Sequence, residues 1–191
     1  MAMHFLTKPV LRGKSVALRP LAVDDAEAMY AALKDPELRR LTGTHKTFTL
    51  AEVVRHCGRL EAAANRWDYG IVADQELIGE AVLNEFDEDN RSISLRIAIW
   101  HANQRDKGYG TEATSLLVGF AFRDLPVDRI ELEVYRFNDR ARQVYEKVGF
   151  TLEGVKREAL IWNSEKVDAL IMSLLRRDYV GGGAEPAPAS S

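Results

Sequence analysis

The 191-residue sequence predicts one α/β domain of the α+β type, in which a mixed, mostly antiparallel sheet of about seven strands carries helices on both faces. Two observations predict this fold class. Short apolar segments follow one another across turn residues, as the strands of antiparallel hairpins do. Two stretches with the apolar spacing of helices then alternate with a strand, as in a crossover unit. The length suits one well-cored domain and is too short for two comfortable ones.

The N-terminal third is expected to hold one strand and two helices. Residues 14–19 are rich in Val, Ala and Leu, which is typical of a strand. Asp24-x-x-Glu27 has the pattern of a helix cap, and so does Thr49-x-x-Glu52. The second cap opens a stretch whose apolar residues recur at helical spacing: Leu50, Val53, Val54, Cys57 and Leu60.

The middle of the chain is predicted to form three strands in a meander, followed by a crossover. Residues 67–73, 77–85 and 92–99 are short, apolar-rich and separated by turn residues. Residues 108–124 then show a helical stripe, and residues 129–134 alternate as a strand does. This order makes the strands at 92–99 and 129–134 parallel neighbours.

The C-terminal third is predicted to hold a helix, a hairpin and a tail. Asn138 caps the helix and Gly149 ends it. Residues 151–162 and 167–175 close the sheet as a last hairpin. The last eleven residues are Gly, Ala, Pro, Ser and one Glu, which cannot bury enough apolar surface to fold. The predicted domain spans residues 1–178, with a disordered tail at 179–191.

The composition excludes several classes of protein. A hydrophobic fraction of 46% beside 29% charged residues is typical of a globular chain, which excludes disorder and fibre. Acidic and basic residues are interleaved at a net charge of -3, which argues against a nucleic-acid-binding surface. No apolar run approaches the ~18 residues that cross a bilayer. Because residues 1–20 also lack a signal-peptide pattern, we expect no membrane association and a cytoplasmic location.

Cysteine and histidine usage predicts neither a disulfide nor a metal site. Cys57 is the single cysteine, and no two of the four histidines have the close spacing of a metal-ligand pair. Because Cys57 lies on an apolar helical stripe, it is a poor nucleophile.

The loop before the helix at 108–124 carries the pattern Arg105-x-x-Gly108-x-Gly110. Glycines at a helix start let backbone N–H groups approach an anion, and the helix dipole favours negative charge there. Arg105 and Lys107 add positive charge. Arg105 stands where a dinucleotide fingerprint has its first glycine, and no Gly-Lys-Ser or Gly-Lys-Thr follows for a nucleoside triphosphate. By itself the loop indicates either a phosphate or pyrophosphate site or a helix start that needs glycine for its conformation.

Two separated motifs extend this pattern. The first is the Arg-x-x-Gly-x-Gly loop continued by Thr111-Glu112-Ala113. The second runs from Leu132-Glu133-Val134 through Asn138, Ala141 and Tyr145 to Lys147-Val148-Gly149-Phe150. With both motifs, nearly the whole folded chain resembles the GNAT superfamily of N-acetyltransferases. Leu18-Arg19-Pro20-Leu21, Glu153-Gly154 and Asp168 further resemble the branch of ribosomal-protein N-terminal (alanine/serine) acetyltransferases, which also holds polyamine and aminoglycoside acetyltransferases.

The resemblance implies acetyl-CoA as co-substrate, with its pantetheine arm in the gap of a splayed parallel strand pair whose ends lie near Ile99 and Val134. Asp106 stands where a glycine is common in the family and brings a carboxylate near the phosphates. The cofactor-binding residues that the resemblance implies are Ala98, Ile99, Trp100, Arg105, Asp106, Lys107, Gly108, Tyr109, Gly110, Thr111, Asn138, Ala141 and Tyr145.

Acetyl transfer to an amine needs a neutral amine, stabilisation of the oxyanion and a proton for the departing thiolate. The resemblance makes Tyr145 the acid, although its apolar helical stripe also suits a core residue. It makes Glu133 the base, acting through water, although a solvated or cross-strand-paired carboxylate is the simpler interpretation. Glu80, Glu85 and His101 are the alternative bases.

We therefore expect an acetyl-CoA-dependent N-acetyltransferase that acts by direct attack, with a protein N-terminal α-amine as the leading acceptor. A small amine such as a polyamine, an aminoglycoside or an amino acid is the alternative acceptor, and a non-catalytic acyl-CoA-binding module is the alternative class. Residues 41–49 and 159–166 are expected to decide the acceptor. The acidic turn at 85–89 is either a solvated hairpin tip or an attractor of cationic amines. A monomer and a homodimer both remain open.

Overall fold

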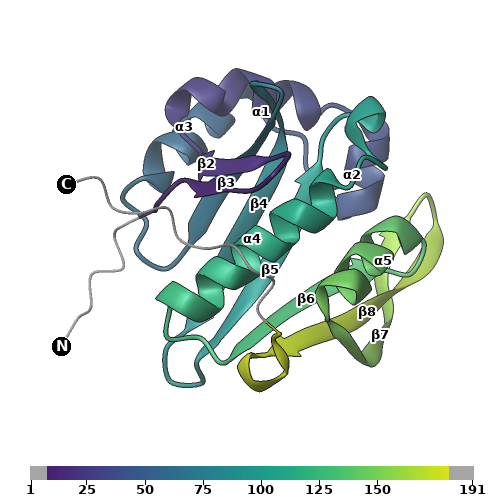
Figure 1. The fold of residues 1–191 in the computed structure, drawn as a ribbon. Helices are drawn as coiled ribbons and strands as arrows, with labels where there is room; N and C mark the ends of the chain where they lie inside the picture. The colour runs from purple at the N-terminus through teal and green to yellow at the C-terminus, as the bar shows by residue number, and fades with distance from the viewer. Residues whose placement is uncertain (1–7, 181–191) are drawn as a thin grey trace, which may run out of the picture.

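The computed structural model describes residues 8–180, and across them eight strands form one sheet in the order β1-β2-β3-β4-β5-β6-β8-β7 (Figure 1). Neighbouring strands are antiparallel except β5 and β6. The expected mixed, mostly antiparallel sheet is confirmed. The additional strand is β1, whose two residues are too few to show alternation. The strand bounds are β1 Leu11–Arg12, β2 Ala17–Pro20, β3 Trp67–Ala73, β4 Glu76–Asp87, β5 Ser92–Ile99, β6 Arg129–Tyr135, β7 Thr151–Trp162 and β8 Glu165–Leu175.

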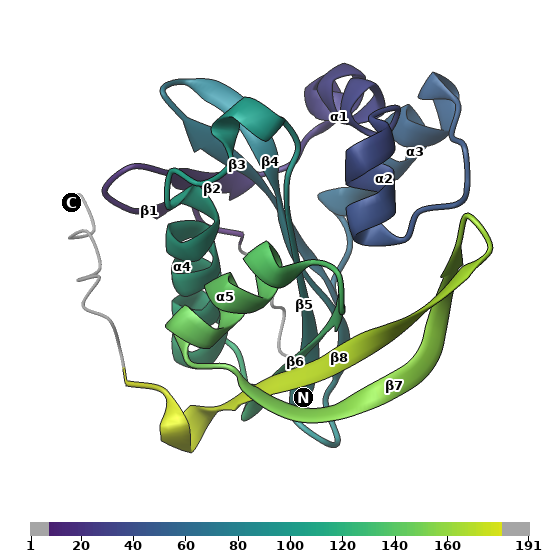
Figure 2. The ribbon, with the colours of Figure 1, turned by 90° about the vertical axis from the view of Figure 1, so that its right-hand side faces the viewer.

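Helices cover both faces of the sheet, as predicted (Figure 2). One hydrophobic core lies between the sheet and helices α4 and α5, and it buries Trp67, Tyr69 and Phe120. A second core lies under α1, α2 and α3 and contains Cys57 and Trp100. The helix bounds are α1 Ala26–Ala32, α2 Pro36–Thr42, α3 Leu50–Leu60, α4 Tyr109–Asp124 and α5 Asp139–Val148.

The segment between β2 and β3 folds into a 3-10 turn at Val23–Asp25 and three helices, instead of the two helices expected. The predicted Asp24-x-x-Glu27 cap is wrong. The neighbouring Asp25 is the N-cap residue of α1, and its carboxylate accepts from the Ala22 N–H at 2.9 Å, which closes the preceding 3-10 turn.

The helix that the sequence did not reveal is α2. The Asp35 carboxylate caps it by accepting from the Leu38 N–H at 2.6 Å, and Pro36 occupies its first position. Gly43 ends it in the left-handed region at φ 64°. A seven-residue helix is too short to show an apolar period, so these end signals were the only ones available. The Thr49–Glu52 capping box of α3 is confirmed.

The parallel pairing of β5 with β6 is confirmed, and it covers only the starts of the two strands. The register runs from Ser92↔Arg129 to Ser94↔Glu131 and then stops. Residues 95–99 of β5 keep β4 on one edge and have no strand partner on the other edge within residues 8–180. β6 meanwhile pairs with β8 along its whole length. The sheet is therefore split between the carboxyl ends of β5 and β6.

The C-terminal elements follow the prediction with one difference. Asn138 caps α5, Gly149 ends it at φ 112°, and β7 and β8 form the last hairpin. Tyr179, which the predicted domain boundary placed in the tail, packs against Phe122 with the two ring centroids 5.2 Å apart. The rest of the predicted tail, from residue 181 on, lies outside the described residues. No helix in the described range is long and apolar enough to cross a bilayer.

Candidate functional site

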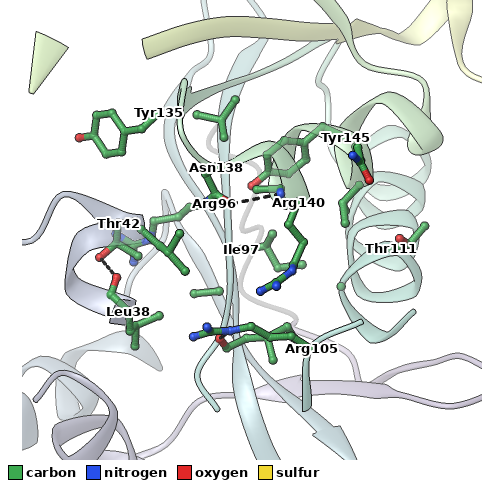
Figure 3. Close-up of a pocket in the computed structure, with 18 of the residues that line it drawn as sticks. Leu38, Thr42, Arg96, Ile97, Arg105, Thr111, Tyr135, Asn138, Arg140 and Tyr145 are labelled. Carbon is green, nitrogen blue, oxygen red and sulfur yellow. Dashed lines mark hydrogen bonds between the residues drawn. The ribbon is translucent and has the colours of Figure 1, made fainter. Parts of the chain in front are cut away.

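A cleft of about 370 Å³ lies at the split between β5 and β6. It extends toward the starts of α4 and α5 on one side and toward α2 on the other (Figure 3). Trp100, Lys107 and Tyr109 do not line it. The other predicted site residues line it: Ala98, Ile99, Arg105, Asp106, Gly108, Gly110, Thr111, Glu133, Asn138, Ala141 and Tyr145.

The start of α4 offers free backbone donors to this cleft. Gly108 precedes the helix in the left-handed region at φ 82°, and a Cβ there would have no heavy atom within 4 Å. Within residues 8–180, the N–H groups of Tyr109, Gly110 and Thr111 have no acceptor, and no side chain caps the helix. Such donors at the start of a 16-residue helix suit an anion, so the backbone here fits the expected pyrophosphate.

The Arg105 side chain points toward α2 and away from the start of α4 (Figure 3). It is 5% exposed and donates to the carbonyls of Ile99 and Trp100, each at 3.3 Å, and to Glu37 Oε2 at 2.8 Å. Its charge is thus compensated by Glu37, contrary to the expectation that it adds charge for the phosphates. The spacing of the loop motif predicts where the backbone lies, but it does not predict the direction of a long side chain such as that of Arg105.

Asp106 has a partner that the sequence did not suggest. Its carboxylate lies 2.9 Å from Nε of Arg140, in the first turn of α5, and both side chains line the cleft. The backbone of Asp106 lies in the left-handed region at φ 61°, which explains why a glycine suits this position. Lys107 instead donates to Gln104 at 3.0 Å.

The edge of β5 that faces the split is open from residue 95 to residue 99 among the described residues. Ala98 and Ile99 lie at its end and line the cleft, so their placement fits the expected pairing with pantetheine amides. Trp100 turns away, because its N–H donates to Ile78 O at 2.9 Å and its side chain lies in the second core.

Tyr145 projects from α5 into the cleft (Figure 3). The residue is only 4% exposed, and its ring contacts that of Phe150 at 5.8 Å. Burial raises the pKa of its phenol well above the usual range, against a smaller lowering by the nearby Arg96 cation. Tyr145 therefore stays protonated at neutral pH and can donate a proton. Its hydroxyl makes no hydrogen bond within residues 8–180, so Tyr145 is a core residue whose phenol is also available to the cleft.

Asn138 is both a helix cap and a cleft residue. Its side-chain oxygen accepts from the Ala141 N–H at 3.2 Å, which holds the start of α5. Its side-chain amide group has no other partner among residues 8–180, so it can donate into the cleft. Ala141 lines the cleft next to it.

Glu133 lines the cleft from β6 and is held by an ion pair. Its side chain is 50% exposed, and Lys156 Nζ of β7 lies 3.1 Å away. None of the alternative bases lines the cleft. Glu80 pairs with Arg96 at 3.4 Å, Glu85 accepts from Ser94, and His101 is exposed.

The acidic turn at 85–89 also lies away from the cleft lining. It precedes β5, whereas the cleft is lined by the second half of that strand. Asp87 is occupied in the turn, where it accepts from the backbone and side chain of Asn90. The turn thus forms a hairpin tip.

The side of the cleft opposite the phosphate loop is walled by α2 and the end of β6. Leu38, Leu41 and Thr42 of α2 line it, as does Tyr135. Gly43 packs so closely on the Tyr135 ring that a Cβ there would come within 2.7 Å of the Tyr135 Cε2 atom. Sequence reasoning pointed to residues 41–49 without identifying their contacts, because α2 itself was missed.

The loop after α2 touches the tip of the last hairpin. The rings of His45 and Trp162 stack with centroids 5.0 Å apart and an interplanar angle of 28°. Two segments expected to bear on acceptor choice, 41–49 and 159–166, are therefore in contact.

The cleft lining carries more positive than negative charge. Its acidic residues among those described are Asp106 and Glu133, and each is engaged in an ion pair. Its basic residues are Arg96, Arg105, Arg140 and Lys147. No cluster of three or more His, Cys, Asp or Glu side chains with metal-binding geometry occurs in the described part of the chain.

Comparison with known proteins identifies the family of this fold. A family model described as an acetyltransferase (GNAT) domain matches residues 15–151, which is well over half of the chain. The Bacillus subtilis (strain 168) protein named "Putative ribosomal N-acetyltransferase YdaF" is 32% identical over 124 residues, which cover 64% of this chain and 67% of that protein.

Solved structures share the fold. Spermidine N-acetyltransferase from Vibrio cholerae, solved with CoA and spermine, has a TM-score of 0.81 at 21% identity over 87% of this chain and 99% of that chain. RimL, the ribosomal L7/L12 alpha-N-protein acetyltransferase in complex with coenzyme A, has a TM-score of 0.77 at 15% identity over 87% and 98%. At these identities the likeness establishes the fold alone.

Proposed function

Because the chain belongs to the GNAT family of acetyl-CoA-dependent N-acetyltransferases, we propose that it acetylates the α-amino group of a protein N-terminus. Membership of the family fixes the reaction and the acetyl donor. The acceptor follows from the charge and the lining of the cleft on the side of α2. The name of the YdaF relative also refers to ribosomal N-acetylation, which supports a protein acceptor.

The observation that carries this proposal is the shortage of free carboxylates in the cleft. A polyamine brings several positive charges, which need carboxylates to compensate them. Among the described residues, the acidic side chains of the cleft lining are Asp106 and Glu133, and Arg140 and Lys156 already neutralise them. Leu38, Leu41 and Tyr135 of the lining offer apolar surface. Such a wall suits one amine attached to a short side chain and a peptide backbone.

The proton balance of the reaction also favours an α-amine. At pH 7 an α-amino group with a pKa of about 7.8 is about one-tenth neutral, whereas an alkyl amine with a pKa of about 10.4 is neutral in well under a thousandth of molecules. A weak base is sufficient for an acceptor that already has a substantial neutral fraction.

In the proposed reaction, each part of the cleft has a separate role. The free N–H groups at the start of α4 hold the pyrophosphate, and the open edge of β5 pairs with the pantetheine arm. Glu133 receives the proton of the attacking amine through a water molecule. As the C–N bond forms and the C–S bond breaks, Tyr145 gives its proton to the leaving thiolate. The acetyl group passes directly to the amine.

Cys57 is consistent with direct attack. It is 2% exposed in the second core, and burial raises the pKa of its thiol, so it is a poor nucleophile. Among the described residues there is no other cysteine. Release of coenzyme A before any amine is added would contradict a direct transfer.

An acceptor panel tests the proposal. The purified chain is incubated with acetyl-CoA and peptides that differ in their first residue, alongside spermidine, an aminoglycoside and free amino acids, and thiol release is recorded. We expect kcat/KM for the best peptide to exceed that for spermidine by about tenfold or more. The same peptide with a blocked N-terminus and a free lysine is the control. Preference for spermidine would overturn the acceptor, and no thiol release with any amine would favour a non-catalytic module.

A further inference from the structure

Helix α2 is attached to both sides of the split in the sheet. Its first turn carries Glu37, whose carboxylate binds Arg105 just beyond the end of β5. Its last residue is followed by Gly43, which packs against the Tyr135 ring at the end of β6. The helix therefore spans the gap in which the pantetheine arm is expected, and it does so on the acceptor side.

The attachment through Arg105 is the one that reaches the cofactor site. Arg105 is the first residue of the phosphate-loop motif, and its side chain is 5% exposed. It donates to the carbonyls of Ile99 and Trp100 at the end of β5. A buried guanidinium needs a counter-charge, and within residues 8–180 Glu37 is the carboxylate that supplies it. One side chain thus joins the phosphate loop, the open strand edge and α2.

We propose that the Glu37–Arg105 pair transmits occupation of the acetyl-CoA site to α2. A ligand that lies along the edge of β5 and on the phosphate loop fixes the two segments that hold the Arg105 side chain. Glu37 is bound to that side chain, and the next residue, Leu38, forms part of the acceptor wall. Glu37 itself does not line the cleft, so it is a positioning residue. The proposal rests on the acetyl-CoA site and not on the acceptor class proposed above.

Hydrogen exchange of the full chain tests this coupling without any acceptor. Backbone amide exchange is measured with and without coenzyme A, for peptides that cover α2 and for peptides that cover the phosphate loop and the start of α4. In the unmodified chain we expect coenzyme A to slow exchange in both segments by about fivefold or more, the lower end of typical coupling between sites. In Glu37→Ala we expect the protection to remain in the phosphate loop and to be lost in α2.

The chain offers a closely matched control variant. Glu27 occupies the second position of α1, as Glu37 does in α2, and both helices have seven residues. Glu27 is exposed, and its side chain makes no ion pair or hydrogen bond within residues 8–180. Glu27→Ala therefore removes the same charge from the same helix position without touching Arg105, and it should leave the response of α2 to coenzyme A unchanged.

Three results would overturn the coupling. The first is that coenzyme A slows exchange in α2 of Glu37→Ala as much as in the unmodified chain, because the coupling would then not pass through Glu37. The second is protection of the phosphate loop alone in the unmodified chain. The third is an equal loss in Glu27→Ala, which would trace the effect to helix stability. Absence of protection in both segments would reject the cofactor site itself, whereas failure of the acceptor panel alone would leave the coupling standing.

Discussion

Tyr145 combines two requirements in one side chain. Its ring belongs to the main core and contacts Phe150, while the residue also lines the cleft. Burial raises the pKa of the phenol, which keeps the proton on oxygen until a strong base appears. Each pKa unit between phenol and thiol costs about 1.4 kcal/mol in proton transfer. The transfer to the thiolate is therefore uphill, and it is least unfavourable when thiolate charge develops, which ties the proton to the step that breaks the C–S bond.

Replacing the hydroxyl tests this role. Tyr145→Phe should lower kcat by about a hundredfold or more, the range of general acid catalysis, and should leave coenzyme A affinity unchanged. The matched control is Tyr69→Phe, which removes another buried phenol hydroxyl without a partner, in the core and away from the cleft lining. Steady-state kinetics and calorimetry measure the two quantities. An unchanged kcat in Tyr145→Phe would remove Tyr145 from the chemistry.

The pH dependence of kcat gives an independent measurement. Because burial raises the pKa of Tyr145 above its ordinary value of about 10, the donor form persists throughout the alkaline range. With both substrates saturating, kcat should therefore show no falling limb below about pH 10. A decline with an apparent pKa below about 9 would assign the acid to another group.

Asp106 places a negative charge beside an anion site. Its carboxylate opposes the phosphates and also occupies Arg140, at 2.9 Å. Asp106→Asn should therefore tighten coenzyme A binding by about fivefold, since a charge repulsion near 4 Å in water amounts to about 1 kcal/mol. Isothermal calorimetry at low and high salt measures this gain, which should shrink with salt.

Asp139→Asn is the control for Asp106. Asp139 is adjacent to Arg140 and similarly exposed, 69% against 70%, but it does not line the cleft. A comparable gain in coenzyme A affinity in Asp139→Asn would show that the effect comes from the overall charge of the protein. Weaker binding in Asp106→Asn would show that the carboxylate instead orders the loop.

At the level of elements, α2 lines one side of the cleft and was the helix hardest to foresee. The long helices and the meander follow from apolar periods and turn residues, which act over short stretches of sequence. A helix of one and a half to two turns has no period, and only its ends, Asp35-Pro36 and Gly43, indicate it. Its importance comes from contacts with Arg105 and Tyr135, far along the chain, which no local pattern encodes.

Gly43 is the residue on which the placement of α2 depends. Gly43→Ala puts a Cβ into a left-handed conformation and against the Tyr135 ring. We expect it to lower the free energy of unfolding by at least about 1 kcal/mol and to reduce kcat/KM for the acceptor. Thermal denaturation and steady-state kinetics measure the two effects.

Gly58 provides the comparison for Gly43. It lies exposed in α3, and its Cβ would have no heavy atom within 4 Å. Gly58→Ala should stabilise the chain by up to about 1 kcal/mol and leave kinetics unchanged. A neutral result for Gly43→Ala would mean that α2 tolerates displacement and does not set the acceptor wall.

For the molecule as a whole, one cross-strand contact joins the three C-terminal strands of the sheet. Glu153 of β7 reaches across β8 to Arg129 of β6, at 2.6 Å, and accepts from Ser173 of β8 at 2.6 Å. The Arg129 hydrogen bonds, with Ser173, lower the pKa of Glu153 from 4.5 to about 2. One side chain thus ties three strands together.

Because of these Glu153 contacts, the free energy of unfolding decreases as the pH falls. A lowered folded-state pKa contributes stability above pH 4.5, and this contribution is lost as the pH falls toward 2. Because the pair is solvent-accessible, screening limits it to about 1 kcal/mol or less. Glu153→Gln should lower the free energy of unfolding at neutral pH and flatten its decline in acid, as urea titrations measure.

Glu165→Gln serves as the control at the other end of the same hairpin. Glu165 is exposed, and its side chain makes no ion pair or hydrogen bond in the described part of the chain. Its removal should leave the acid dependence of unfolding as it is. A Glu153 variant that retains the full decline in acid would assign the dependence to other carboxylates.

The sequence predicted most of the sheet and the backbone part of the site, and much less of the side-chain part. Apolar patterns and turn residues predicted every long strand, and the two motifs predicted the loop at Gly108 and the position of Tyr145. The direction of Arg105 and the pairing of Asp106 with Arg140 were missed. Both depend on which charges meet after folding, and residues distant in sequence decide this.

The His45–Trp162 stack has a consequence for the way an acceptor enters. From α2 the chain leads to His45, which rests on Trp162 at the hairpin tip. The hairpin returns through β8 to β6, β6 adjoins β5, and Arg105 beyond β5 binds Glu37 in α2. These contacts connect α2, the last hairpin and the end of β5 in one continuous series along the cleft. For the protein acceptor proposed above, this arrangement means that the N-terminal tip of the polypeptide enters the cleft between α2 and the last hairpin.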